Sequence, residues 1–249
     1  AVRIQGVSVN RITPSFIQDD TTTLAPKAAL QYASWNFPRN GVVIPIQSLP
    51  LNESEKGKLG MYLAVCGRGR GAGENFALYR EFDADNFILE GVIDAPAIAG
   101  LCAGTLATHT PTTSEDTTNT LDIWFFDNIQ LESVLQADID RYPTINLLRI
   151  GDEWIQFRTA TAQTLEQYSP YRSKWRVSNL WRGRFGTESE VGTHASNEYA
   201  VLYSSAVKFY ELNADDIGQD IVFKAVTAGQ AEENAFTTTV TAAQISAWS

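Results

Sequence analysis

The chain is organised as short apolar runs separated by turn-forming residues. Val, Ile, Leu and aromatic residues recur in stretches of a few positions, and Gly, Pro, Asn or Asp bound most of these stretches. Such runs predict β-strands, because β-branched and aromatic side chains fit a pleated, half-buried surface. The predicted strands are Val42–Ile44, Met61–Cys66, Phe87–Leu89, Asp122–Phe126, Leu147–Ile150, Glu153–Arg158, Trp175–Val177, Tyr199–Tyr203, Val207–Leu212 and Asp220–Val226.

Helical periodicity is confined to two short stretches, Ala95–Leu106 and Ala242–Trp248. Strands do not alternate with amphipathic helices, so a parallel α/β sheet is not expected. Gly151 and Asp152 separate two of the apolar runs, which predicts a tight hairpin because glycine tolerates positive φ. The sequence therefore predicts an all-β fold, an antiparallel sandwich or barrel with short strands, long polar loops and little helix.

The apolar runs also suggest how the chain divides. Residues 1–40 mix prolines with polar stretches and are expected to form a connecting segment with possible edge strands. Residues 41–230 are expected to carry the β-rich domain, either undivided or as two sub-barrels over 41–120 and 121–230. Residues 231–249 would then be a C-terminal extension.

The stretch Thr108–Thr120 is almost wholly polar and small. It cannot bury enough apolar area to offset its ordering entropy, so we expect an exposed loop. Cys66 and Cys102, the two cysteines, both lie in apolar surroundings. They are expected to be buried free thiols, although the sequence alone leaves a disulfide between them open.

Composition narrows the classes of function. The chain has 19 Lys and Arg against 29 Asp and Glu, a formal net charge of −10. A nucleic-acid partner is not expected, since binding one requires a basic surface to neutralise phosphates. An anionic membrane surface is disfavoured for the same reason, and no apolar run is long enough to predict a membrane span. With only two histidines and two cysteines, most histidine-based chemistry and a cysteine-rich zinc site are unsupported.

A glycine-rich stretch, Gly67–Gly73, follows the predicted strand Met61–Cys66 and matches the permissive G-x-G-x-x-G/A dinucleotide pattern. Such a site needs a helix to begin at the glycines, so that its N-terminus holds the pyrophosphate. The following residues, Glu74–Phe82, fit a strand at least as well. A glycine-rich hairpin loop is therefore the favoured interpretation.

Acidic residues occur close together in ways that a glycoside hydrolase could use. These residues are Asp83 with Asp85, Asp152 with Glu153, Asp215 with Asp216, Glu232 with Glu233, and Asp94. Their separation in space is not encoded in the sequence, and an acidic chain is expected to carry scattered surface carboxylates. Asp83–Asn86 also resembles part of a calcium loop, but it lacks the glycine and the distal glutamate, which favours a plain turn.

The two histidines, His109 and His194, belong to no recognisable nucleophile motif. We therefore assign no catalytic residue, no metal ligand and no cofactor-binding residue from the sequence. Trp124, Trp154 and Trp175 lie in predicted strands and are expected to pack in the core. Trp181 lies outside these runs and is a speculative contact for a partner or a glycan.

The most distinctive part of the chain is Ile150–Phe157 together with Trp175–Glu188. It predicts a hairpin strand, a loop, a second strand and then a turn rich in arginine and glycine. Gly183 and Gly186 would permit positive φ in that turn.

Arg182 and Arg184 in the same turn carry fork-shaped donors. These donors could tie loop carbonyls, or carboxylates such as Glu153 and Glu188, by paired hydrogen bonds. We therefore expect a rigid corner that performs no chemistry.

This pattern resembles the C-terminal domain of the large tail-tip protein (baseplate hub, "megatron" type) of siphophages and gene transfer agents. The signature positions are Gly151, Glu153, Arg182, Gly183, Gly186 and Thr187, with His194–Ala195 following. Weaker similarity, in the same order along the chain, covers Pro45–Leu51, Tyr62–Val65, Ala77–Arg80, Asp94–Gly100 and Asp220–Val226.

The resemblance implies a structural component of a phage or phage-like tail tip, located in the virion, which acts in assembly and host-surface contact and is not an enzyme. The implied partners are other tail or baseplate proteins, a homotrimer in the assembled tail, and a host surface glycan or receptor. No cofactor is implied, and the sequence has no signal-peptide pattern. Two alternatives stay open: a carbohydrate- or receptor-binding β-module, and a glycoside hydrolase.

Overall fold

A computed structural model describes residues 41–67, 75–167, 169–227 and 235–242. The elements presented below belong to one unit, which comprises residues 38–166 and 171–249. The connecting segment 1–40 therefore lies outside the described residues, as does nearly all of the helical turn expected at Ala242–Trp248. Within the described ranges, no helix is both long and apolar enough to cross a membrane.

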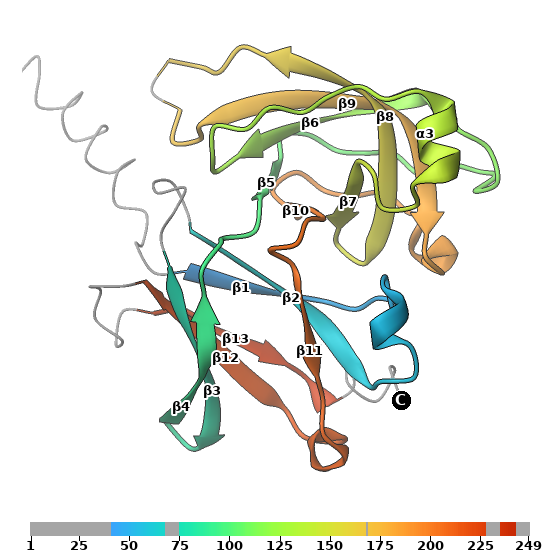
Figure 1. Cartoon of the computed structure of the whole chain (residues 1–249). Coiled ribbons are helices and arrows are strands. Elements are labelled where there is room, and N and C mark those ends of the chain that lie inside the picture. Colours follow the sequence, from blue (N-terminus) through green and yellow to red (C-terminus); the bar gives the residue numbers. More distant parts are fainter. Residues whose placement is uncertain (1–40, 68–74, 168, 228–234, 243–249) are drawn as a thin grey trace, which may run out of the picture. The chain divides into compact units, whose positions relative to one another are not determined.

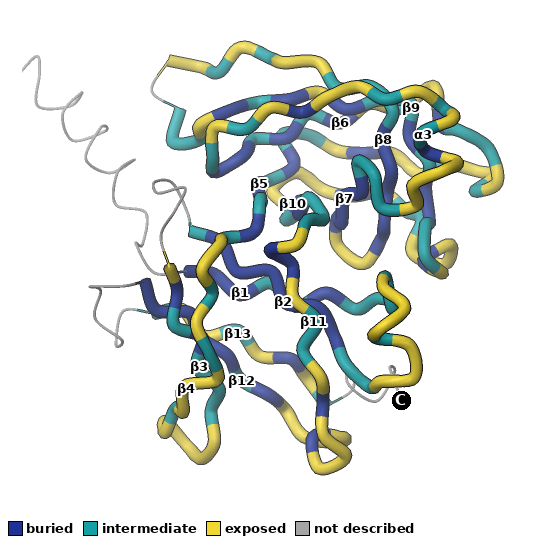
Figure 2. Tube along the Cα trace, viewed as in Figure 1, coloured by how far each residue is buried: buried dark blue, intermediate teal, exposed yellow. Residues whose placement is uncertain are grey.

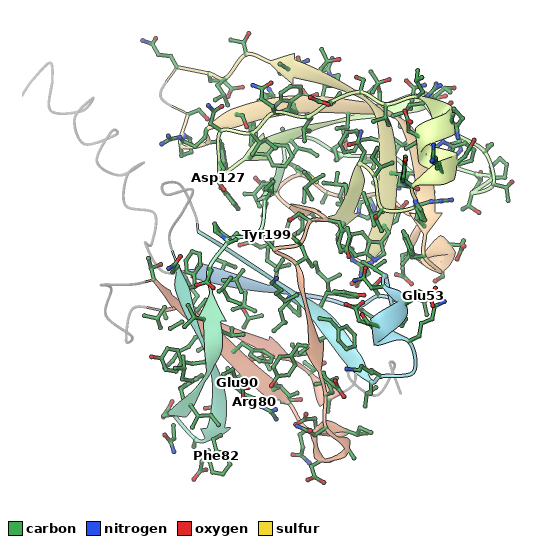
Figure 3. All side chains as sticks on the ribbon, viewed as in Figure 1. Glu53, Arg80, Phe82, Glu90, Asp127 and Tyr199 are labelled. Atoms are coloured by element: carbon green, nitrogen blue, oxygen red, sulfur yellow. The ribbon has the colours of Figure 1, made fainter. Side chains whose placement is uncertain are left out.

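The first of two antiparallel sheets has seven strands, in the order β11-β2-β1-β12-β3-β4, with β13 also paired to β12 (Figure 1). Its strands are β1 (Gly41–Ile46), β2 (Gly60–Gly67), β3 (Phe76–Asp83), β4 (Asn86–Ile93), β11 (Lys208–Glu211), β12 (Ile221–Thr227) and β13 (Thr237–Val240). Strand β4 is an edge, and exposed Phe82 projects from the tip of the β3–β4 hairpin (Figure 3).

The second sheet is a closed barrel in the order β10-β5-β6-β9-β8-β7, so each of its strands is paired on both sides. Its strands are β5 (Ala99–Cys102), β6 (Asp116–Phe125), β7 (Leu147–Ile150), β8 (Glu153–Gln163), β9 (Ser173–Arg184) and β10 (Tyr199–Leu202). Closure leaves no barrel strand with a row of unpaired backbone groups. The helices among the described residues are short: α3 (Gln136–Arg141) and 3₁₀ turns at Glu53–Glu55, Glu188–Glu190 and Ala214–Asp216.

The structure confirms the all-β, antiparallel fold expected from the sequence, and each predicted apolar run contributes to a strand. The predicted hairpin is also present, since Ile150 pairs with Glu153 across the turn and Gly151 has a φ of 51°. The division into sheets does not follow a boundary at residue 120. The chain builds β1–β4, leaves to form the barrel, and returns to the first sheet with β11–β13.

The burial pattern explains why two sheets form (Figure 2). One hydrophobic cluster fills the barrel, and every barrel strand contributes to it; its members include Cys102, Phe125, Leu148, Phe157, Leu180 and Ala200. A separate cluster lies on the seven-stranded sheet and includes Val43, Met61, Phe76 and Phe223. A third cluster joins side chains of both sheets, among them Tyr62, Leu147, Trp154 and Val201.

Both cysteines are buried, as predicted. Cys66 belongs to the cluster that joins the two sheets, whereas Cys102 belongs to the barrel cluster. Burial raises the pKa of the Cys102 thiol to about 12. This thiol therefore behaves as a small apolar side chain rather than as a nucleophile.

The predicted helical turn at Ala95–Leu106 is wrong, because part of this segment is strand β5. Gly100 pairs with Phe125 of β6 and with Ala200 of β10. A Cβ atom added to Gly100 would lie within 3.0 Å of the Trp124 carbonyl oxygen, so the two strands approach closely only because glycine has no side chain. Pairing on both sides within the barrel overrides the weak local helical pattern.

The exposed loop predicted for Thr108–Thr120 is also only partly correct. Residues 116–120 open strand β6, and Asp116 is fully buried. Its carboxylate accepts hydrogen bonds from the backbone N–H groups of Thr118 (3.1 Å) and Asn119 (2.9 Å). These bonds satisfy a buried charge that an argument from apolar area alone does not take into account.

The tryptophan prediction holds for Trp154 and Trp175, which are buried, but not for Trp124, which is half-buried. Trp124 alternates along β6 with the inward-facing Ile123 and Phe125, so its ring lies on the outer face of the barrel. There it stacks on Tyr171 with ring centroids 5.3 Å apart.

We predict that Gly100→Ala destabilises the protein by about 1–3 kcal/mol, because the new Cβ overpacks the β5–β6 pair. Gly104→Ala is the matched control, since a Cβ at that position would meet nothing within 4 Å. Chemical denaturation followed by circular dichroism measures both. Equal free energies of unfolding for the two variants would contradict the close approach of β5 and β6.

Candidate functional site

The arginine- and glycine-rich corner begins with a β-bulge in β9. Trp154 pairs with Arg184 and Gln156 pairs with Trp181, so the two residues Arg182 and Gly183 oppose the single residue Ile155. Gly183 has a φ of 64°, the left-handed conformation that a bulge of this kind needs. A Cβ at Gly183 would lie 2.9 Å from the Glu188 Cα, so the position also requires a residue without a side chain.

The turn after β9 continues this unusual backbone. Phe185 and Gly186 have φ values of 55° and 77°. A Cβ at Gly186 would lie 2.8 Å from Leu49 Cδ1, so this glycine packs directly against the segment that follows β1. The positive φ of Phe185 is not signalled by the sequence, because non-glycine residues rarely adopt it.

The bulge places Arg182 against Glu153 of the neighbouring strand β8. Arg182 Nε lies 2.6 Å from Glu153 Oε1 and Arg182 Nη2 lies 2.7 Å from Oε2, a paired arrangement of two charge-assisted hydrogen bonds. Both side chains have no exposed surface. The expectation that Arg182 ties a carboxylate such as Glu153 is therefore met by the structure.

The remaining donors of Arg182 reach three other segments. Nη1 donates to the Ala107 carbonyl oxygen (2.9 Å) and lies 3.7 Å from Asp116 Oδ2. Nη2 also donates to the Gly192 carbonyl oxygen (3.0 Å). Glu153 Oε1 in turn accepts the Gly183 N–H (2.9 Å). One guanidinium thus connects β8, the start of β6, and the loops on either side of the Leu106–His194 bridge.

His194, itself buried, completes the cluster. Its Nε2 lies 2.8 Å from Glu153 Oε2, and its Nδ1 lies 2.8 Å from Glu198 Oε2. A carboxylate at each ring nitrogen favours the doubly protonated imidazolium, which can donate to both. We call Arg182, Glu153, His194, Glu198 and Asp116 the corner cluster.

The pKa values of His194, Glu153 and Asp116 shift in the directions that keep these three groups charged. Burial alone would lower the pKa of His194, but its hydrogen bonds to Glu153 and Glu198 raise it above its ordinary value of 6.5. Burial would raise the pKa of Glu153, but the bonds from His194 and Arg182 lower it. Backbone N–H donors and the Asn119 amide likewise outweigh burial and lower the pKa of Asp116.

The structure brings the remaining signature residues to the same corner. Gly151 turns beneath His194, because a Cβ there would lie 3.5 Å from His194 Nδ1. The Thr187 hydroxyl donates to the Arg184 carbonyl oxygen (2.7 Å) and accepts the Trp154 N–H (3.0 Å). Gly151, Glu153, Arg182, Gly183, Gly186 and Thr187 therefore act on one short stretch of β8 and on the turn after β9.

Arg184 and Trp181, two other residues of the corner, donate to amide oxygens of the same chain. Arg184 Nε donates to the Gln156 amide oxygen (2.7 Å), not to a carboxylate. Trp181 is half-buried, and its Nε1 donates to the Gln136 amide oxygen of α3 (3.2 Å). The indole N–H of Trp181 is therefore engaged within the chain.

Sequence reasoning missed Asp116, Glu198 and the role of His194. Asp116 lies in a stretch that composition marks as exposed. The sequence marks His194 only as a histidine without a nucleophile motif and as part of the family resemblance; its i+4 spacing to Glu198 is the signal that could identify its role. His109, the other histidine, lies beside Asp116, with Nδ1 3.6 Å from Oδ1.

The other candidate carboxylates are dispersed among the described residues. Asp83 ends β3 and Asp85 lies in the β3–β4 turn, as expected for a plain turn. Asp216 pairs with Arg80, which also donates to the Tyr210 hydroxyl (3.2 Å). Glu232 and Glu233 lie outside the described residues. In the part of the chain that the structure covers, no group of three or more His, Cys, Asp and Glu side chains is placed to hold a metal ion.

The glycine-rich stretch Gly67–Gly73 can be assessed only at its ends. Gly67 closes β2, and the next described element is strand β3. A dinucleotide site of the usual kind would need a helix there. Residues 68–74 lie outside the described residues.

Beside the corner cluster lies a cavity of about 430 Å³. The tip of the corner forms one wall with Phe185, Gly186 and Thr187, while Arg182 and Glu153 are not part of its lining. Arg149 lies in another wall and donates to the Asp152 carbonyl and, at 2.8 Å, to the Asp152 carboxylate. Burial lowers the pKa of Arg149 to about 10, although Asp152 opposes this effect.

We predict that Arg182→Met costs about 3–5 kcal/mol of stability, because it removes the paired bond to the buried Glu153 carboxylate and the positive charge beside Asp116. Arg176→Met is the matched control. Arg176 lies on β9 like Arg182 and makes a similar paired bond to Asp122 of β6, but it is about half exposed. Its loss is expected to be much smaller. Urea denaturation measures both, and an equal effect would contradict a special role for the buried pair.

A second prediction concerns pH. Because the pKa of His194 is raised in the folded state, its stabilising contribution is complete below its ordinary value of 6.5 and is lost as pH rises through the raised value. Because the pKa of Glu153 is lowered, its contribution is complete above its ordinary value of 4.5 and is lost as pH falls through the lowered value. The free energy of unfolding should therefore be greatest between the acid transition of Glu153 and the alkaline transition of His194, which form the two limbs of the stability profile.

Melting temperatures measured across the pH range test this prediction. The wild-type protein should lose stability as pH rises through the His194 transition, and His194→Gln should flatten that limb. The acid limb should be reduced but not abolished, because Arg182 still lowers the pKa of Glu153. If the melting temperature of His194→Gln falls with rising pH as steeply as that of the wild type, His194 is not charged in the folded cluster.

Comparison with known families finds a match over part of the chain. Residues 97–201 match the family model described as Rcc01698-like, C-terminal. The match covers less than half of the chain, begins just before β5 and ends within β10, so it coincides with the barrel and includes the corner cluster. No curated protein matches the chain. Over this region, the barrel is similar to the C-terminal domain of Rcc01698-like proteins.

Proposed function

We propose that the chain is a structural component of a phage or phage-like tail tip, where it serves assembly and host-surface contact. The observation that carries the proposal is the corner cluster. Its arginine, its histidine and the carboxylates of Glu153 and Asp116 are buried, whereas Glu198 is partly exposed. All are bonded to one another or to backbone groups, and together they tie distant segments. The family match over residues 97–201 is compatible with the tail-tip resemblance.

The proposal assigns no enzymatic activity to the chain. A general acid or base must reach the proton that it transfers in a bound substrate. Glu153 has no exposed side-chain surface, and the His194 ring is held between two carboxylates. The groups best suited to acid–base chemistry are therefore occupied in holding the fold.

The partners follow from the same proposal. Other tail or baseplate proteins and further copies of the chain, arranged as a trimer, would contact its surface in the virion. The edge strand β4 exposes Ile88, Leu89 and Val92, which supports a protein neighbour rather than a free edge. The net charge of −10 argues against nucleic acid as a partner.

Immunogold electron microscopy of purified particles tests this function. Antibodies raised against the chain should label one end of the tail, and mass spectrometry should find the chain in the same particles. Complementation of a deletion with Arg176→Met should restore labelled particles, whereas Arg182→Met should yield fewer. Particles that contain none of the chain would contradict the proposal.

A second candidate function, saccharide or receptor binding, is favoured by a specific observation. The cavity beside the corner cluster has aromatic walls and charged groups of both signs. Saccharide or receptor binding is compatible with the proposed structural role, because a tail tip must contact a host surface.

A further inference from the structure

The cavity beside the corner has the dimensions of a small-molecule site. Its volume of about 430 Å³ falls within the range of about 300–1,000 Å³ that is typical of ligand pockets. It is bounded by the turn after β9, by the segment that follows β1, and by the start of β11. These segments come from both sheets of the same unit.

Two aromatic side chains line the cavity. Phe185 is held in place by the strained turn between Arg184 and Gly186, and Phe209 packs edge-on against Tyr62 with ring centroids 5.3 Å apart. Both rings are half-buried, so each keeps some accessible surface. An aromatic face attracts the weakly positive C–H groups of a flat apolar ligand surface.

The charged groups of the cavity carry both signs. Arg149 and Lys58 are positive, and Asp152 and Glu190 are negative. Arg149 pairs with Asp152 at 2.8 Å, and Lys58 pairs at 2.8 Å with Glu211, which lies outside the lining. An anionic ligand would meet Asp152 and Glu190, and a cationic ligand would meet Arg149 and Lys58, so an uncharged ligand fits best.

The polar lining of the cavity is suited to a ligand with many hydroxyl groups. The cavity offers Ser48, Thr187 and Ser189 hydroxyls, together with charged donors and acceptors. A ligand hydroxyl both donates and accepts, so it can satisfy neighbours of either kind.

We propose that this cavity binds one uncharged saccharide unit, whose apolar face packs on Phe185 or Phe209 and whose hydroxyls bond to the surrounding charged and hydroxyl groups. The inference deepens the host-surface contact proposed above and rests on that function for its biological meaning. Binding itself is measured on the chain alone, so the two proposals can fail separately.

Isothermal titration calorimetry of the full chain tests the proposal. The uncharged probes are the methyl glycosides of glucose, galactose, mannose and N-acetylglucosamine, and the charged probes are glucuronate and glucosamine. Saturable binding of at least one uncharged probe is expected, with the charged probes binding at least about tenfold more weakly. Tryptophan fluorescence gives a second readout, because Trp154 Nε1 donates to Ser48 Oγ (2.7 Å) in the cavity wall.

Matched variants locate the binding. Glu190→Ala removes a lining carboxylate, and Glu188→Ala removes an exposed carboxylate from the same 3₁₀ turn that does not line the cavity. Lys58→Ala and the nearby Lys56→Ala form a second such pair. Glu190→Ala or Lys58→Ala should weaken binding at least about tenfold, whereas each control should change it less than about twofold. Unchanged melting temperatures ensure that the variants are folded.

Several results would overturn the proposal. These are no binding of any uncharged probe, preference for a charged probe, or equal effects of Glu190→Ala and Glu188→Ala. Release of free sugar from a methyl glycoside would also overturn the proposal. It would show that the cavity hydrolyses the ligand, with Asp152 and Glu190 as the carboxylates involved, rather than only binding it. Absence of the chain from purified particles, with saccharide binding intact, would contradict the tail-tip function and leave the binding site standing.

Discussion

The buried bond between Arg182 and Glu153 is the interaction on which the barrel end depends. Moving two charges out of water costs several kcal/mol per ion, and their mutual attraction offsets this only when the remaining donors and acceptors are also satisfied. Here the Gly183 N–H, two backbone carbonyls and His194 supply those partners. The bond can therefore hold together β8, β9 and two loops that are distant in sequence.

The backbone conformation at the corner makes the bond between Arg182 and Glu153 possible. A bulge at Arg182 and Gly183 turns the guanidinium towards β8, and the positive φ values of Phe185 and Gly186 then reverse the chain against Leu49. The same turn places Phe185 and Thr187 in the wall of the neighbouring cavity. A rigid joint thereby shapes a surface site without taking part in its chemistry, which is how structural and binding roles can coexist in one segment.

The sequence predicted what depends on local chemistry. Strand positions, the hairpin at Gly151 and the positive φ of Gly183 and Gly186 all follow from residue type and spacing. What it could not supply depends on distant partners. Strand β5 forms because Gly100 lets β6 approach, and His194 joins the corner cluster because Glu153, from a distant strand, lies 2.8 Å from its Nε2. The order of the strands, with β11–β13 returning to β1–β4, likewise follows from pairing between segments far apart in the chain.

A double-mutant cycle between Arg182 and Glu153 tests the central claim most directly. Free energies of unfolding would be measured for the wild type, Arg182→Met, Glu153→Gln and the double variant. If the two side chains stabilise the corner as a pair, the coupling free energy should reach about 1–3 kcal/mol, and the second substitution should cost much less once the first is present. Additive losses would contradict the account, because they would mean that the two residues act independently.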